Sequence, residues 1–353
     1  MKRTLLFLVF AFCLNYAFSQ KLIAVQNGGE PDFYEDVDEA FTNAIEGDTL
    51  YFPGGSFNVN RSIYTKFHII GVGHNPDNTS STGSTIFSSS NPDLPQLQYF
   101  TGGGGSVTGI AFTNVNAQGN IVVNSDIDGL VIDRVNLPNG FNCVTGVVKN
   151  LFMTKSITDR IDIREINGIL PSGTISNNII NWRSHYFTNL TIENNIFLTN
   201  DSNWLNSTRL MYANNCNVIN NIFNVGMSGR IIPSSTNSSF RNNFGLGGST
   251  ITSNSNFLSN NLLISNLTFN DIFSNYISNN ISLIYESDLH LVDNSPLLTA
   301  ANDGGQIGIY GGRFPWKDGS VPFNPHIVSK NISGSTNENG DLPVEIEVEA
   351  QQN

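Results

Sequence analysis

Charged side chains are scarce in this chain of 353 residues, and basic ones are scarcer than acidic ones. Asp, Glu, Lys and Arg make up 13% of the sequence, about half the share found in an ordinary globular domain. The 29 acidic residues outnumber the 17 basic ones. Because nucleic-acid binding depends on Lys and Arg that neutralise phosphates, nucleic acid is excluded as an expected partner. A low charge density suits a fold with stacked equivalent residues, since like charges on neighbouring strands repel.

Cysteine is almost absent, with only three residues in the chain. Cys13 lies in an N-terminal apolar run, and the bulky Phe12 before it argues against a lipid anchor. Cys143 and Cys216 lie far apart in the sequence, whereas a disulfide needs Cα atoms within about 7 Å. We interpret both as small buried core residues and leave their oxidation state open.

Long apolar runs are also missing, since none approaches the ~20 residues needed to cross a bilayer. The first residues nevertheless form a recognisable leader. Lys2-Arg3 precede an apolar run over 5–14, and Ala17-Phe18-Ser19 follow it. This order is typical of a signal peptide, here residues 1–19, which is removed to leave Gln20 at the N-terminus. The sequence therefore predicts an exported protein without a membrane span, located outside the cell, at its surface or in the periplasm.

Asparagine is abundant and occurs in a repeated phrase: apolar, any residue, Asn, Asn, apolar. The phrase returns about every 20 residues, a period typical of one turn of a solenoid that cannot bury its apolar side alone. Successive turns of a parallel solenoid stack about 4.8 Å apart, so equivalent residues form ladders. The pattern predicts an all-β, single-stranded right-handed parallel β-helix whose structural ladder consists of the second asparagines, Asn178, Asn195, Asn221, Asn243, Asn261 and Asn280.

Two adjacent asparagines are expected at a sharp bend between strands. Asn adopts the left-handed conformation more readily than most other non-glycine residues, and a buried Asn can bond the amides above and below it. The flanking apolar residues Ile192 and Ile196, like Val218 and Ile222, are expected to point into the core. The alternative, a row of asparagines that binds sugar, is disfavoured.

The two ends of the chain are expected to close the solenoid. Apolar residues over 33–45 follow a helical period, with Asp32 placed to cap the helix and Gly47 to end it. We assign residues 20–47 to an N-terminal cap, 48–292 to the β-helix and 293–353 to a closing segment with a tail. The alternation over 344–348 predicts a terminal strand that covers an exposed sheet edge.

Two phrases resemble a known family. Residues 47–56 read Gly-Asp-Thr-Leu-Tyr-Phe-Pro-Gly-Gly-Ser, and Ile69-Ile70-Gly71 follow. This opening resembles the first coils of exported right-handed parallel β-helix repeat proteins of the pectate-lyase-like superfamily, of the Bacteroidetes type. The stretch 294–312, with Asn-Ser-Pro-Leu and later Gly-Ile-Tyr-Gly-Gly, is similar to the closing segment of the same proteins. The resemblance implies the solenoid and export, whereas the function of these relatives is largely uncharacterised.

One charge cluster offers candidates for catalysis. A polysaccharide lyase of this fold uses a Lys or Arg base and often Ca²⁺ held by carboxylates. The candidate catalytic residues are Lys155, Arg160, Asp162 and Arg164. The favoured interpretation is a solvated strand face with mutual ion pairs. We expect no cofactor and no metal site, and Ca²⁺ enters only under the lyase alternative.

Three aromatic residues are candidates for carbohydrate binding. Trp182, Tyr186 and Trp204 would form a platform for sugar rings if they shared one exposed face. Trp182 and Trp204 both lie just past an Asn turn, where stacking in the core is also plausible, and the platform is the less favoured interpretation.

Three classes of function are compatible with these features. We favour an exported non-catalytic β-helix protein, a monomer that binds glycan or another surface component, because the charges that catalysis needs are few. The alternatives are a Ca²⁺-assisted polysaccharide lyase or other carbohydrate-active enzyme, and a purely structural or adhesive surface protein. The fold alone does not separate them.

Overall fold

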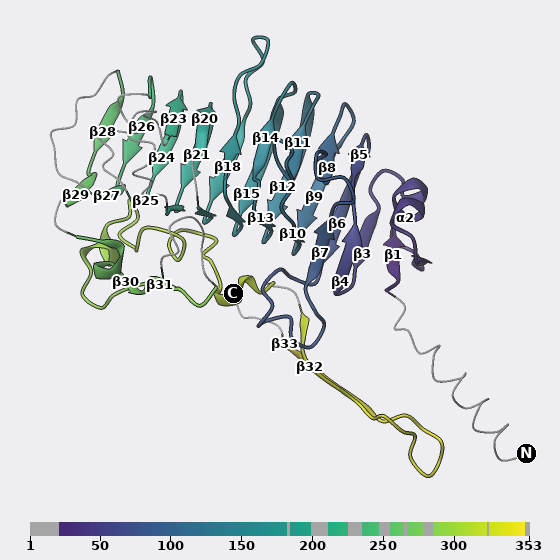
Figure 1. Cartoon of the computed structure of the whole chain (residues 1–353). Helices are drawn as coiled ribbons and strands as arrows, with labels where there is room; N and C mark the ends of the chain where they lie inside the picture. Colours follow the sequence, from purple (N-terminus) through teal and green to yellow (C-terminus); the bar gives the residue numbers. More distant parts are fainter. Residues whose placement is uncertain are drawn as a thin grey trace, which may run out of the picture.

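The computed structural model describes residues 21–181, 184–198, 211–224, 235–246, 255–264, 267–277, 285–322 and 325–349. Its strands stack coil upon coil into a parallel β-solenoid (Figure 1). This confirms the predicted fold class, an all-β parallel β-helix. None of the helices in these ranges is both long and apolar enough to cross a membrane.

Three sheets run along the solenoid and are built from short strands of successive coils. In the first sheet β1 (Ile23–Gln26) and β2 (Asp32–Tyr34) precede the parallel strands β3 (Thr49–Phe52), β6 (Lys66–Gly71), β9 (Gly104–Thr108), β12 (Ile127–Asp133), β15 (Val148–Thr154), β18 (Gly173–Ser176), β21 (Leu190–Glu193), β24 (Asn217–Ile219), β26 (Ser239–Arg241) and β28 (Phe257–Ser259). The second sheet contains β4 (Gly55–Asn58), β7 (Thr85–Ser88), β10 (Ala111–Phe112), β13 (Asn136–Leu137), β16 (Ile157–Thr158), β19 (Ile179–Ile180), β22 (Ile196–Phe197), β25 (Ile222–Phe223), β27 (Phe244–Leu246) and β29 (Leu262–Ile264).

The third sheet is interrupted partway along the solenoid. It contains β5 (Arg61–Ile63), β8 (Leu97–Tyr99), β11 (Ile121–Val123), β14 (Phe141–Cys143) and β17 (Ile161–Asp162). A parallel bridge from Ile163 to Phe187 leads to two further strands of the same side, β20 (Ser184–Thr188) and β23 (Met211–Asn214). Cys143 and Cys216 are both buried and unbonded to each other.

The N-terminal cap differs in detail from the expectation. Helix α2 (Val37–Asn43) lies at one end of the stack (Figure 1) and buries Ala40 and Phe41. The predicted helix over 33–45 is too long, because residues 32–34 form β2 and pair antiparallel with β1. Asp36, rather than Asp32, accepts the capping bond from the backbone N–H of Glu39 at 2.9 Å, and the helix ends at Ala44, before Gly47.

The asparagine pairs occupy the bend between the first and second sheets. The first residue of each pair has a left-handed backbone, with φ between 52° and 58° at Asn177, Asn194, Asn220, Asn242 and Asn260. The second residue points inward, and four of these asparagines are fully buried. Their side chains form a continuous column in which each Nδ2 donates to the next Oδ1 at 3.0–3.1 Å, through Asn178, Asn195, Asn221, Asn243 and Asn261. Asn280 lies outside the described residues.

The orientation of this column corrects one expectation about the core. Ile192 and Val218 point into the interior, but Ile196 and Ile222 belong to a second apolar cluster on the outer face of the second sheet. Side chains alternate along a strand, so an inward Asn195 forces Ile196 outward and Phe197 inward.

A return segment, residues 285–322, covers the outer face of the second sheet. It follows β30 (Phe273–Asn275), which pairs with β31 (Asp288–Leu291), and it contains the 3₁₀ turns η4 (Pro296–Thr299) and η5 (Asp318–Ser320); η3 (Phe269–Asp271) precedes it. The first asparagines hold it in place. Asn177 Nδ2 donates to the carbonyls of Ile309 and Gly311 at 2.8 Å, and Asn242 Nδ2 donates to that of Ala300 at 2.9 Å.

The terminal strand does not cover a solenoid edge, contrary to expectation. β33 (Val344–Glu349) is exposed throughout, and among the described strands its one partner is β32 (His326–Ile332), in a hairpin that projects from the body (Figure 1). The alternating sequence predicts a strand but carries no information about its partner.

We predict that Asn221→Ala lowers the free energy of unfolding by about 3 kcal/mol, because it leaves several buried backbone and amide groups without partners. Asn221 donates to Ile192, Ile219 and Asn243, and accepts from Asn195. Urea denaturation measures the change. The exposed Asn275→Ala is the control, expected within about 0.5 kcal/mol of wild type. Equal losses in both variants would show that the column contributes nothing specific.

Candidate functional site

The predicted catalytic cluster is divided between different corners of one coil. Lys155 takes the left-handed position of the first bend (φ 45°), and its Nζ lies 3.5 Å from Asp133 Oδ1. Arg160 lies between the second and third sheets, where its Nη2 donates to the carbonyl of Gln118. Asp162 and Arg164 lie on or just after the third-sheet strand β17. The second-sheet strand β16 therefore separates Lys155 from the other candidates.

The third sheet does bring together residues from two predicted groups. Arg164 Nη2 lies 2.7 Å from Asp162 Oδ2, and its guanidinium carbon lies 4.8 Å from the centre of the Tyr186 ring. Tyr186 in turn lies 5.6 Å from Tyr212, at an interplanar angle of 37°. Tyr186 is 38% exposed although Arg164 and Tyr212 both lie against it. Trp182 and Trp204 lie outside the described residues.

Burial affects the acid of this stack. It raises the pKa of Asp162, although the neighbouring Arg164 and Arg160 oppose the shift. Asp162 Oδ1 is buried and has no hydrogen bond among the residues that the structure describes. A carboxyl group with a raised pKa is better suited to act as a general acid than an ordinary surface carboxylate is.

Metal binding has no assembled site in the part of the chain that the structure describes. No three His, Cys, Asp or Glu side chains converge there. Asp126 and Asp128 accept from the backbone N–H of Val147 and from Asn150 Nδ2, respectively. Each of these carboxylates therefore accepts a hydrogen bond from the next coil.

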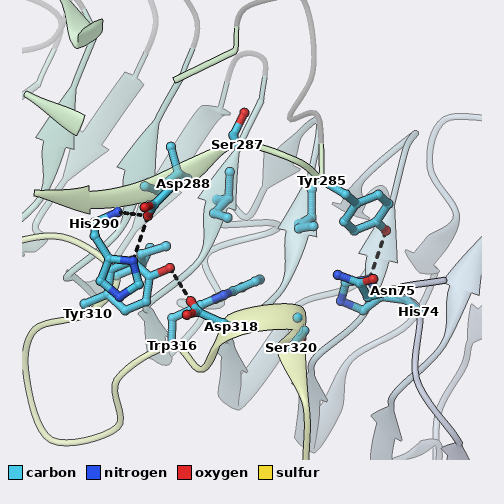
Figure 2. Close-up of a pocket in the computed structure, with 15 residues that line it drawn as sticks. His74, Asn75, Tyr285, Ser287, Asp288, His290, Tyr310, Trp316, Asp318 and Ser320 are labelled. Atoms are coloured by element: carbon cyan, nitrogen blue, oxygen red, sulfur yellow. Dashed lines mark hydrogen bonds and ion pairs between the residues drawn. The ribbon is translucent and has the colours of Figure 1, made fainter. Parts of the chain in front are cut away.

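The return segment encloses a cavity of about 300 Å³ against the second sheet, which we name the first cavity. Figure 2 shows its polar side chains gathered from the return segment and from the loop after β6. Its floor is apolar. The second sheet and the return segment both contribute to this floor, through Ile157, Ile179, Leu289, Ile309 and Trp316. The volume lies at the lower end of the range for small-ligand sites, and a few polar groups over an apolar floor are typical of them.

One side of the first cavity holds a chain of four polar residues (Figure 2). His290 Nδ1 lies 2.7 Å from Asp288 Oδ1, and the His290 ring stacks on Tyr310 with centres 3.9 Å apart. The Tyr310 hydroxyl donates to Asp318 Oδ1 at 2.7 Å. Partial burial opposes ionisation of Asp288, but the hydrogen bonds from His290 outweigh it and lower its pKa. Burial and the Asp318 carboxylate raise the pKa of Tyr310. The phenol thus stays protonated as a donor, and both carboxylates accept.

The inner side holds a second chain that ends in an unused donor. Asn136 Nδ2 donates to the Tyr285 hydroxyl at 2.9 Å, and within the described residues the only acceptor in reach of the phenol proton is His74 Nδ1, at 3.0 Å. This places the imidazole proton on His74 Nε2. Burial, with a smaller contribution from Arg134, lowers the pKa of His74 to about 3, so the ring is neutral. Nε2 is buried and has no hydrogen-bond partner in the described part of the chain.

Sequence patterns did not identify the first cavity. Tyr285 and His74 are 211 residues apart, and only the return of the chain joins them. The spacing of Asp288 and His290 was the single local signal, because alternate residues of a strand share a face.

Comparison of the chain with family models, with curated proteins and with solved structures found no match. The chemistry of the site is therefore the basis for assigning a function.

We predict that stability falls as the pH drops from 7 to 4. The folded pKa of His74, about 3, lies below the ordinary 6.5, so only the unfolded chain takes up this proton in that window. The expected contribution is about 3 kcal/mol, measured by urea denaturation at each pH. His74→Gln should lose less on acidification, whereas the control His68→Gln, at an exposed position, should follow wild type. Parallel curves for all three proteins would contradict the assignment.

Proposed function

We propose that this protein is an exported, non-catalytic β-solenoid that binds a saccharide of a glycan or cell surface in the first cavity. The observation that carries the proposal is the buried, unused donor of His74 opposite a rim of acceptors, above an apolar floor. A site of this composition fits a ligand with hydroxyl groups around an apolar body.

Hydroxyl groups suit this cavity because each can both donate and accept. Asp288 and Asp318 offer carboxylate oxygens to ligand hydroxyls, and His74 Nε2 offers a proton to a ligand oxygen. The apolar floor can pack the C–H face of a sugar ring. Two carboxylates at the rim disfavour an anionic group there, which supports a neutral saccharide.

Binding without catalysis agrees with the state of the acidic groups. A general acid at neutral pH needs a raised pKa, whereas that of Asp288 is lowered. The predicted lyase base Lys155 is separated from Asp162 and Arg164. The lyase remains the second candidate, supported by the buried Asp162 beside Arg164, and it would use the third sheet.

We predict that the purified protein binds a neutral saccharide on a glycan array, and that Asp288→Asn and Asp318→Asn each weaken this binding about tenfold. Each change replaces an acceptor oxygen with an N–H₂ group at nearly constant shape, which costs about one hydrogen bond. Isothermal titration calorimetry with the best array ligand gives the affinities.

Asp303→Asn is the matched control. Asp303 lies in the same return segment but outside the first cavity, where its carboxylate accepts from Gly305 N–H. It should bind like wild type. Equal affinity in all variants would place the ligand elsewhere. Release of an ultraviolet-absorbing unsaturated sugar, lost in Arg164→Ala, would instead establish the lyase.

A further inference from the structure

A second cavity of about 400 Å³ lies beside the first and has a different chemistry. Its walls are mainly apolar and come from the first coils and from the end of the return segment with the start of β32, namely Tyr51, Ile70, Val72, Val321, Pro322, Pro325 and Ile327. The two cavities share only Gly319 and Ser320 in their linings. The proposed saccharide site does not use this second cavity.

The guanidinium of Arg134 provides a permanent positive charge in the lining of the second cavity, which also includes the imidazole of His326. Arg134 occupies the left-handed position of the first bend, with φ 51°, where later coils have the first Asn of each pair. It is 7% exposed. Nε lies 3.0 Å from Asp133 Oδ2, whose other oxygen lies 3.5 Å from Lys155 Nζ. Arg134 Nη1 is buried and makes no hydrogen bond within the described residues.

A buried donor on a charged group is costly when it has no acceptor. Asp133 does not accept a hydrogen bond from Arg134 Nη1. One of its carboxylate oxygens pairs with Arg134 Nε, and the other lies near Lys155 Nζ. A guanidinium group and a carboxylate carry opposite charges and have complementary planar shapes. Their pairing is stronger where the local dielectric constant is low. The apolar walls would cover the rest of such a ligand. Burial is the main cause of the lowered pKa of His74, and the positive charge of Arg134 contributes to it.

We propose that the second cavity is a binding site for a small organic acid, whose carboxylate pairs with Arg134 and whose apolar body fills the space between Val72 and Pro322. The class is an aliphatic or aromatic carboxylic acid, neither a sugar nor a free inorganic anion. The proposal is independent of the saccharide site, because it uses other residues and another ligand chemistry.

The bend itself supplies a matched pair of variants. Arg134→Asn introduces the residue that Asn177 and its successors already place at this backbone conformation, so the turn is preserved. Lys155→Asn removes a cation from the same row one coil later, at a residue that does not line the second cavity. The two variants differ in whether the cation removed faces that cavity.

The experiment titrates 3-phenylpropanoate, its neutral amide and acetate into the full protein by calorimetry. Wild type should bind 3-phenylpropanoate at least tenfold more tightly than the amide or acetate. Arg134→Asn should abolish the preference for the acid over the amide, and Lys155→Asn should retain it. Val72→Phe, which keeps Arg134 but narrows the cavity, should weaken 3-phenylpropanoate tenfold or more.

Three results would overturn the proposal. One is the absence of binding of 3-phenylpropanoate to wild type, and another is equal affinity for the acid and the amide. The third is unchanged acid binding in both Arg134→Asn and Val72→Phe, with folding verified by circular dichroism. Saccharide binding, measured in parallel, reports separately on the first cavity.

Discussion

The column of hydrogen-bonded asparagine side chains is the interaction on which the rest of the solenoid depends. Each amide at the bend bonds the amide of the next coil and also the backbone groups that the turn would otherwise leave buried without partners. The coils are thereby held in one register, because a shift by one residue would place every inward side chain outside. An inward Asn221 fixes Val218 in the interior and Ile222 on the outer face.

The apolar residues on the outer face of the second sheet must be shielded from water by another part of the chain. Ile179, Ile196 and Ile222 form a strip along the second sheet, which water would meet if the return segment were absent. The left-handed asparagines beside this strip aim their amides at the segment. One short phrase thus does two things, since its second Asn stacks the coils and its first Asn fastens the chain that comes back. The cavities lie where that chain spans the surface without filling it.

The bend row changes character toward the N-terminal coils, where Arg134 and Lys155 replace asparagine. Two cations share the carboxylate of Asp133, and the return segment passes over them through Gly319 and Ser320. Substitution of a structural amide by a charge is unexplained by the fold alone, and it coincides with the cavity that has Arg134 in its wall. The same solenoid thus has two cavities of different chemistry without a change in its backbone plan.

The sequence by itself determined the stacked architecture, because a period of about 20 residues and a left-handed residue in each bend leave a parallel solenoid as the natural solution. It also determined that Asn178 and its equivalents lie at one place in successive coils. Only the tertiary structure decided which apolar neighbours face inward, since that depends on the direction of the second Asn. Only the return of the chain joined His74 with Tyr285, and placed Ser320 against the backbone of Lys155. The local sequence pattern predicts strands, turns and the repeat period. Contacts between residues two hundred positions apart arise from packing, which no local pattern encodes.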